Sequence, residues 1–385
     1  MGASQSAPLR PETPAGHHRG GPPSPKPREV YVDAFRGLMA LVMVQGHVCD
    51  TLLTPAARLA PLYVYQTIFH GSTAPGFLFA SGFVAGLPRA PLSWKASVRR
   101  ARRLLFVLAV GYAIHLPYFS LLKTIESSPA QKAALFACDA LQVIAATQLG
   151  VIALQLLLGR RWVPVATALG VLVLAAGPFV WASQVSSQLP PVIAAYVDAR
   201  HGSTFPVFPF SAFVLAGALA GATIGRAEPR IRHRRAVWAG LTLLGLGFLI
   251  AIPLRGVVDF WGVSPAYALV RLGGLLLLLR FMEAVAARAS VLARVLALLG
   301  HETLLVYVLH LLLLYGGVLG PAPLGPLHGR LGYVEALLVV AALVPVLLLA
   351  AALWRRFKTR APHAATLVLV FLGAWFLGEF FARPW

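Results

Sequence analysis

The side chains best suited to chemistry lie in one mainly apolar stretch near the start of the chain, which contains Asp33, Arg36 and His47. In a helix, at 100° per residue, these three side chains lie roughly on one face. At 1.5 Å per residue, His47 lies about 21 Å beyond Asp33 along the axis. Because an imidazole exchanges protons near neutral pH, this face combines a charged pair with a candidate general base. A structural interpretation is also open, in which Asp33 and Arg36 anchor the helix end and His47 is a hydrogen-bonded core residue.

Three other apolar segments each contain a histidine at a similar expected depth, namely His70, His115 and His310. Two glycines and a proline follow His70 within six residues. They either kink the helix for packing or break it, and broken membrane helices are tolerated where they line a cavity. Tyr307 lies three residues before His310 and therefore shares its helix face. We expect the histidines to converge. No HxxxH or HExxH spacing is present, so no metal site is predicted.

The composition indicates the kind of protein that positions these residues. Hydrophobic residues make up 58% of the 385 positions and charged residues only 12%, whereas a soluble domain carries about 25% charge. A bilayer requires ~20 mainly apolar residues per helix. Applied along the chain, this length predicts an all-α, polytopic integral membrane bundle of about eleven spans. Their expected limits are 33–53, 63–87, 104–122, 135–158, 162–183, 206–225, 236–254, 264–286, 295–316, 333–353 and 364–382.

Basic residues alternate between the connecting loops, as the positive-inside rule requires. This pattern accounts for the net charge of +20 better than nucleic-acid binding, which we do not expect. It predicts a multi-pass plasma (inner) membrane protein with its N-terminus in the cytoplasm and its C-terminus outside. Residues 1–28 are rich in Pro, Gly and Ser and are expected to be a disordered cytoplasmic tail. Residues 29–385 form the membrane domain. Within its eighth span, we interpret Arg271, Arg280 and Glu283 as a structural ion pair.

The stretch from Arg28 to His47, with Asp33, Arg36 and Gly37 in register, resembles the opening motif of a known group of membrane enzymes. This group is the transmembrane acyltransferase superfamily, which includes the acyltransferase-3 and heparan-alpha-glucosaminide N-acetyltransferase-like families. Three later segments fit the same resemblance. They are Phe77 to Phe83 (FLFASGF), Phe205 to Gly217, and Gly300 with the Tyr307 to His310 segment.

The resemblance implies that an acyl group, usually acetyl, passes from acetyl-CoA on the cytoplasmic side to a sugar or amino sugar on the far side. By position, His47 corresponds to the catalytic histidine of the acyltransferase-3 pattern. Arg36, and with it Arg28 and Asp33, belongs to the expected acyl-CoA site. In the heparan-type branch the catalytic histidine precedes the second span, near His70 but not in register with it. The base is therefore open between His47 and His70.

We therefore predict a membrane acyltransferase with His47, His70 and His310 as catalytic residues and Arg28, Asp33 and Arg36 as donor-binding residues. Its expected partners are the bilayer, acetyl-CoA and a carbohydrate acceptor from the cell envelope, and no metal cofactor is predicted. The alternative is a transporter or channel whose histidines relay protons or bind substrate. Transporters often consist of two related halves, and the sequence shows no internal repeat, which favours the enzyme.

Overall fold

The computed structural model describes residues 30–87, 93–116 and 119–383, and within these ranges the chain forms helices and no strands. The all-α prediction is confirmed. The long helices are α1 (Val30–Leu52), α5 (Trp94–Ile114), α8 (Ala140–Leu158), α9 (Trp162–Ser183), α11 (Val207–Ala220), α12 (Pro229–Leu254), α13 (Pro265–Arg288), α16 (Tyr333–Arg360) and α17 (Pro362–Ala382). Two further segments are divided, into α3 (Pro61–His70) with α4 (Thr73–Gly86) and α14 (Ser290–His301) with α15 (Thr303–Tyr315).

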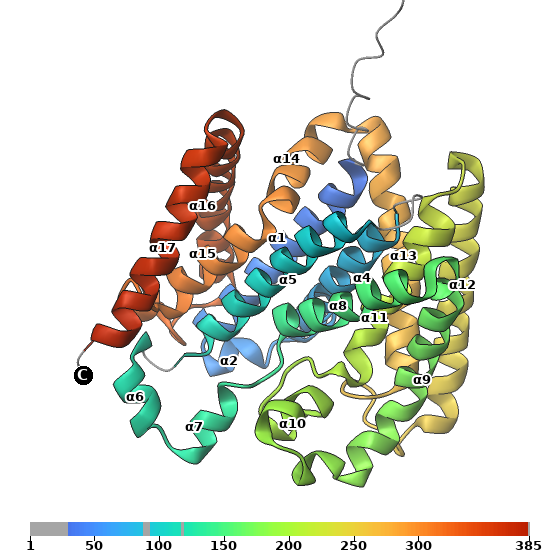
Figure 1. The fold of residues 1–385 in the computed structure, drawn as a ribbon, viewed down its shortest axis with the longest axis horizontal. Coiled ribbons are helices and arrows are strands. Elements are labelled where there is room, and N and C mark those ends of the chain that lie inside the picture. The colour runs from blue at the N-terminus through green and yellow to red at the C-terminus, as the bar shows by residue number, and fades with distance from the viewer. Residues whose placement is uncertain (1–29, 88–92, 117–118, 384–385) are drawn as a thin grey trace, which may run out of the picture.

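Short helices complete the described fold. They are α2 (Pro55–Arg58), α6 (Leu121–Glu126), α7 (Pro129–Ala134) and α10 (Pro191–Val197), with single turns η2 (Gly159–Arg161), η3 (Val185–Gln188), η4 (Ala199–His201), η5 (Gly221–Gly225) and η6 (Gly325–Leu327). Figure 1 shows α2, α6, α7 and α10 near the bottom of the molecule, with the start of α1 and the α16–α17 loop near the top. The long helices run between these two ends.

The chain is a multi-pass membrane protein. Within the described residues, six helical stretches are long and apolar enough to cross a bilayer, or seven if the bent pair α14 and α15 is one span. In the count of six, α8 and α9 are joined into one stretch. Each of the predicted segments overlaps a helix or a helix pair. The number of crossings, about eleven at ~20 residues each, stays a prediction.

Helix α1 is the centre of the fold and packs against α3, α4, α13, α14, α15 and α16. Its closest neighbour is α14, because both helices lack side chains where they meet. A Cβ atom at Gly37 would lie 1.8 Å from the carbonyl oxygen of Leu296, and one at Gly300 would lie 1.7 Å from that of Asp33. Small residues permit such backbone contact between membrane helices. The glycines thereby fix α1, which carries Arg36 and His47, against the broken segment that carries His310.

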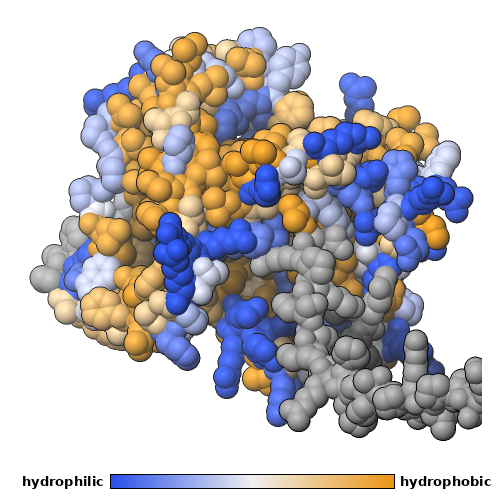
Figure 2. All heavy atoms as spheres, turned by 90° about the horizontal axis from the view of Figure 1, so that it is seen from above, coloured by the Kyte–Doolittle hydropathy of each residue, from blue (hydrophilic) through white to orange (hydrophobic). Residues whose placement is uncertain are grey.

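One end of the bundle, which we call the basic end, contains the start of α1. Here Arg232 lies over the Tyr31 ring, 5.6 Å from its centroid. Glu283 forms ion pairs with Arg232 at 2.5 Å and with Arg280 at 3.2 Å. Figure 2 views this end from above and shows separate hydrophilic groups, with hydrophobic surface on the side of α16 and α17. The predicted pair of Arg280 with Glu283 is confirmed, but Arg271 is not part of it and lies near α3.

The opposite end, which we call the histidine end, contains the end of α1 and the break between α3 and α4. Pro75 explains this break, because proline lacks an N–H and its ring clashes with the carbonyl of the residue four positions earlier. That residue is Gly71, and its freed oxygen accepts a hydrogen bond from the Tyr267 hydroxyl at 3.2 Å. Arg271 donates to the carbonyl of Ile68 at 2.6 Å and contacts the Ser72 hydroxyl. Two side chains of α13 therefore hold the break in place.

Candidate active site

Two histidines from different helices form the centre of the site. His47 of α1 and His310 of α15 lie with Nδ1 of the first 2.8 Å from Nε2 of the second, and their rings are stacked with centroids 5.1 Å apart. His310 is fully buried, and its Nδ1 lies 2.8 Å from the Val306 carbonyl oxygen. The sequence analysis predicted that the histidines would converge, but it did not predict this direct contact between His47 and His310.

These two hydrogen bonds fix the proton positions on both rings. A carbonyl oxygen only accepts, so the Nδ1 of His310 carries the proton that it donates to Val306. In the neutral ring, Nε2 of His310 is then an acceptor, and the Nδ1 of His47 must donate to it. The neutral His47 consequently has its lone pair on Nε2. Among the described residues, no group forms a hydrogen bond with this atom, which is suited to accept a proton or attack an electrophile.

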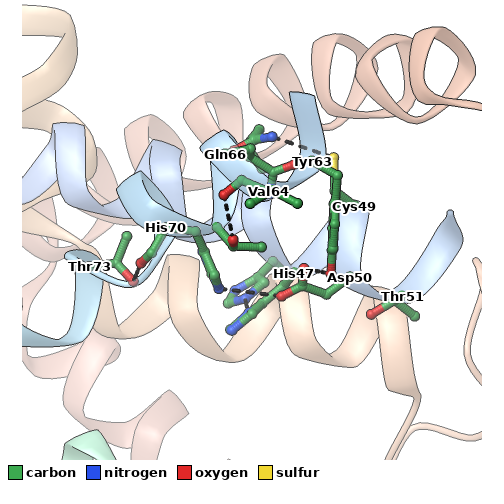
Figure 3. A network of polar contacts seen from close by, with 12 residues as sticks. His47, Cys49, Asp50, Thr51, Tyr63, Val64, Gln66, His70 and Thr73 are labelled. Carbon is green, nitrogen blue, oxygen red and sulfur yellow. Dashed lines mark hydrogen bonds and ion pairs between the residues drawn. The ribbon is translucent and has the colours of Figure 1, made fainter. Parts of the chain in front are cut away.

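His70 approaches the pair from the broken segment. Its ring centroid lies 5.4 Å from that of His47, with the planes at 72°, and its Nε2 lies 3.5 Å from the Asp50 carboxylate. Figure 3 shows His70, His47 and Asp50 directed toward one another. The approach requires glycine at position 46, because a Cβ there would lie 1.7 Å from the Nδ1 of His70. The α3–α4 break, together with the missing side chain at Gly46, therefore positions His70.

Asp50 is a site residue that the sequence reasoning missed. Its Oδ1 accepts a hydrogen bond from the Tyr63 hydroxyl at 2.9 Å, while its Oδ2 faces His70. An ionised carboxylate only accepts, so the Tyr63 phenol is the donor in this contact. The available signal was its position three residues after His47, on the same face of a helix.

Of the other polar residues that the sequence singled out, Tyr307 lies in the site, whereas His115 contacts a separate polar group. The Tyr307 ring lies 5.7 Å from that of His310, as their shared helix face predicts. His115 does not join the other histidines in a direct contact. Its Nε2 lies 2.9 Å from the Asp139 carboxylate, and the Gln142 amide lies 3.4 Å from its Nδ1. The expected convergence therefore holds for three of the four histidines.

The charged pair predicted in α1 is found near the basic end. The Arg36 guanidinium lies 3.6 Å from the Asp33 carboxylate and donates to the Thr303 hydroxyl at 2.6 Å. Asp33 is buried and also faces His301 at 3.4 Å. Arg28, predicted to bind the donor with them, lies outside the described residues. Thr303 and His301 were missed as partners because nothing in the sequence reveals that the late segment bends between them.

The bend between α14 and α15 measures 74° and is anchored by three consecutive side chains. His301 and Thr303 contact α1, as described above, while Glu302 is buried and accepts an ion pair from Lys358 of α16 at 2.6 Å. Since α15 begins at Thr303 and carries His310, this anchor also sets the position of His310 beside His47. Helix α1 thus carries both Arg36 and His47. Helix α15 contacts the first through Thr303 and the second through His310.

Comparison with protein families gives a match to most of the chain. None of the curated proteins searched matches the chain. The profile of an acyltransferase domain, that of the acyltransferase-3 family, matches residues 29–355. The match includes every helix that contributes to the histidine cluster and to the contacts of Arg36. By this match over most of its length, the chain belongs to the acyltransferase-3 family and is a membrane acyltransferase.

Proposed function

We propose that this membrane acyltransferase moves an acyl group, typically acetyl, from acyl-CoA to a hydroxyl or amine of a cell-envelope sugar, with His47 as the general base. The observation that carries the proposal is the pair of hydrogen bonds from His47 through His310 to the Val306 carbonyl. They leave the lone pair of His47 on Nε2, the atom that must receive the proton of the acceptor. Family membership favours this reading over a transporter.

The donor is proposed to bind at the basic end, on the cytoplasmic side of the plasma membrane. CoA carries several phosphates, and guanidinium groups form strong charge-assisted hydrogen bonds to phosphate. Arg36 and the four arginines in the first half of α5, Arg99, Arg100, Arg102 and Arg103, supply such groups. Eleven residues of helix separate Arg36 from His47, about 16 Å at 1.5 Å per residue. The extended arm of CoA is suited to span this separation.

Asp33 has a supporting role in this arrangement. Its carboxylate is only 3% exposed and faces Arg36 and His301, so it does not meet an anionic donor directly. A carboxylate beside a guanidinium restricts the orientation of the guanidinium and offsets part of its charge. We therefore assign donor contact to Arg36 and positioning to Asp33.

The transfer step follows from the position of the free lone pair. The acceptor oxygen or nitrogen attacks the thioester carbonyl carbon while Nε2 of His47 takes its proton. The resulting imidazolium is stabilised because His47 donates its Nδ1 proton to His310. Collapse of the tetrahedral intermediate breaks the carbon–sulfur bond, and the CoA thiolate takes the proton from His47. The Tyr307 hydroxyl is a candidate donor to the oxyanion. In the covalent variant of this route, the same Nε2 attacks the thioester first and is acylated.

The decisive experiment compares two histidine variants in nanodiscs supplied with acetyl-CoA and cell-envelope glycans. Acceptor-dependent release of CoA is expected to fall by ~10²–10⁴-fold in His47→Ala, the usual range for loss of a general base. His363→Ala is the matched control, because His363 is exposed on α17. Wild-type turnover in His47→Ala would remove this residue from the mechanism.

A further inference from the structure

Arg58 and Arg330, which lie at the histidine end, have no counter-ion within the part of the chain that the structure describes. Three other cations of this end are paired: Lys123 with Glu126 at 3.2 Å, Arg200 with Asp198 at 3.9 Å, and Arg383 with Glu379 at 3.2 Å. By contrast, the side chains of Arg58 and Arg330 have no ion pair or hydrogen bond among the described residues. The positive-inside rule disfavours such residues here, so their presence calls for an anionic partner.

Arg58 is the more informative of the two because part of its guanidinium is buried. Its Nε is inaccessible to solvent and has no acceptor within hydrogen-bond distance. A buried donor without a partner destabilises a protein, so the Arg58 guanidinium keeps hydrogen-bonding capacity that no described residue uses. Lys132 of α7, Arg255, after α12, and Arg330 itself also have no ion pair among the described residues, but all three are exposed and solvated. Arg58 therefore differs from an ordinary surface cation.

Backbone hydrogen bonds place both arginines beside the last turn of α1. Gly329 and Leu331, the neighbours of Arg330, donate to the carbonyls of Thr51 and Leu52 at 3.0 and 2.9 Å. The N–H of Arg58 donates to the carbonyl of Thr54 at 3.2 Å, and Thr54 in turn donates to Leu331 at 2.9 Å. One backbone network thus connects the segments that contain Arg58 and Arg330.

The same region leads inward to the histidines. The charge of Arg58 acts on the Tyr63 hydroxyl. Tyr63 donates to Asp50, and Asp50 faces His70 beside His47. The Asp50 side chain is 35% exposed, so this carboxylate stands at an accessible edge of the cluster. Cations on the outer side and a carboxylate on the inner side would orient an acceptor that has an anionic group distant from its reacting hydroxyl.

We propose that Arg58 and Arg330 bind a phosphate or carboxylate of the acceptor, which is therefore an acidic glycan or a sugar phosphate. Guanidinium groups bind both anions in the same bidentate geometry. The inference rests on the proposed function, because it assumes that the acceptor approaches His47 from this end. It adds the chemical class of the acceptor and two residues that select it.

The test is a binding titration of the full chain in nanodiscs of phosphatidylcholine, with glucuronate, glucose 1-phosphate and glucose as probes. Wild-type protein is expected to bind at least one of the two anionic sugars ~10-fold more tightly than glucose, as expected for one charge-assisted contact. Arg58→Gln and Arg330→Gln should each abolish that preference, whereas Lys132→Gln, the matched loss of charge, should retain it. Equal binding of all three probes, no binding of either anion, or an unchanged preference in both arginine variants would overturn the proposal.

Two further arms separate the alternatives. If the arginines instead hold a lipid headgroup, their substitution will change stability only in nanodiscs that contain phosphatidylglycerol, and the sugar preference will be absent. Transfer from radiolabelled acetyl-CoA to the preferred probe, compared between wild type and His47→Ala, tests the underlying function. Selective binding of an anionic sugar without transfer in the wild type would contradict the proposed function and leave the anion site standing.

Discussion

At the scale of single residues, the chemistry depends on which nitrogen of His47 carries the proton. His310 decides this through its own hydrogen bond to Val306. We expect His310→Ala to lower kcat by ~10²-fold, at the lower end of the range for general-base catalysis. The KM for acyl-CoA should not change, because His310 does not lie near Arg36. Steady-state transfer assays with varied acyl-CoA measure both quantities.

The same prediction has an internal control. Glutamine at position 310 can offer an amide oxygen to the Nδ1–H of His47, so His310→Gln should recover part of the lost rate. If His310→Ala and His310→Gln were equally impaired, a purely steric role for this buried side chain would explain the loss. Unchanged kcat in both variants would contradict the proton assignment itself.

Arg36 is expected to act on donor affinity and not on the chemical step. Loss of one charge-assisted contact should raise the Kd of acyl-CoA by roughly 10-fold in Arg36→Ala. Calorimetric titration of the solubilised protein with CoA measures this change. Arg288→Ala is the control, since Arg288 is an exposed cation at the end of α13. An equal loss of affinity in both variants would indicate a general electrostatic effect in place of a specific contact.

The sequence was sufficient for the residues whose roles follow from spacing along one helix. Asp33, Arg36 and His47 were predicted in this way, and the first two do form an ion pair. Contacts across helices were not predictable to the same degree. The pairing of Arg36 with Thr303 joins positions that are 267 residues apart, and no periodic pattern encodes such a contact. Asp50 was missed because a single carboxylate at a helix end resembles an interfacial residue.

At the scale of elements, the absence of a side chain at Gly46 of α1 matters as much as the histidines. A Cβ at Gly46 would meet the imidazole of His70, which can rotate away but would then leave Asp50. Gly46→Ala should therefore retain most of its thermal stability and lose activity by about 10²-fold, a typical cost of a misplaced catalytic group. Gly150→Ala is the control, because a Cβ at Gly150 of α8 meets nothing within 4 Å. Wild-type activity of Gly46→Ala would argue against a role for His70.

Gly37 should behave in the opposite way. The atom that a Cβ there would meet is the backbone carbonyl oxygen of Leu296, at 1.8 Å, and backbone cannot rotate away. Helices α1 and α14 would have to separate, with an overpacking cost of about 1–3 kcal/mol. We expect Gly37→Ala to lower the midpoint of thermal unfolding in detergent. A midpoint equal to that of the wild type would show that the α1–α14 contact is less rigid than its geometry indicates.

Helix location could be predicted because apolar length is a strong signal, whereas helix breaks were predicted unevenly. Pro75, with Gly71 before it and Gly76 after it, indicated the interruption between α3 and α4. The 74° bend between α14 and α15 has no proline. It depends on three polar residues that bind two other helices, and such partners are visible only in three dimensions. The bend nevertheless positions His310, so part of the site follows from it.

At the scale of the whole molecule, separated charge makes a vectorial reaction possible. The arginine-rich loops and the histidine cluster lie at opposite ends of α1, and the two ends differ in their basic residues. The positive-inside rule predicts that the basic end faces the cytoplasm, the side from which we propose that acyl-CoA binds. It also predicts that Arg58, Arg330 and the histidines face the outer side, from which we propose that the acceptor approaches. The orientation is the assumption that both proposals share.

Labelling of single cysteines with a membrane-impermeant maleimide on intact cells tests this orientation. Lys132→Cys, on α7 at the histidine end, should react in intact cells, and Arg288→Cys, at the basic end, should react only after the cells are permeabilised. Both positions are exposed, so access to the reagent decides the result. The native residues Cys49 and Cys138 are fully buried and provide the unlabelled background. The reverse pattern would place the histidines in the cytoplasm, where an envelope sugar could not reach them, and would contradict the proposed direction of transfer.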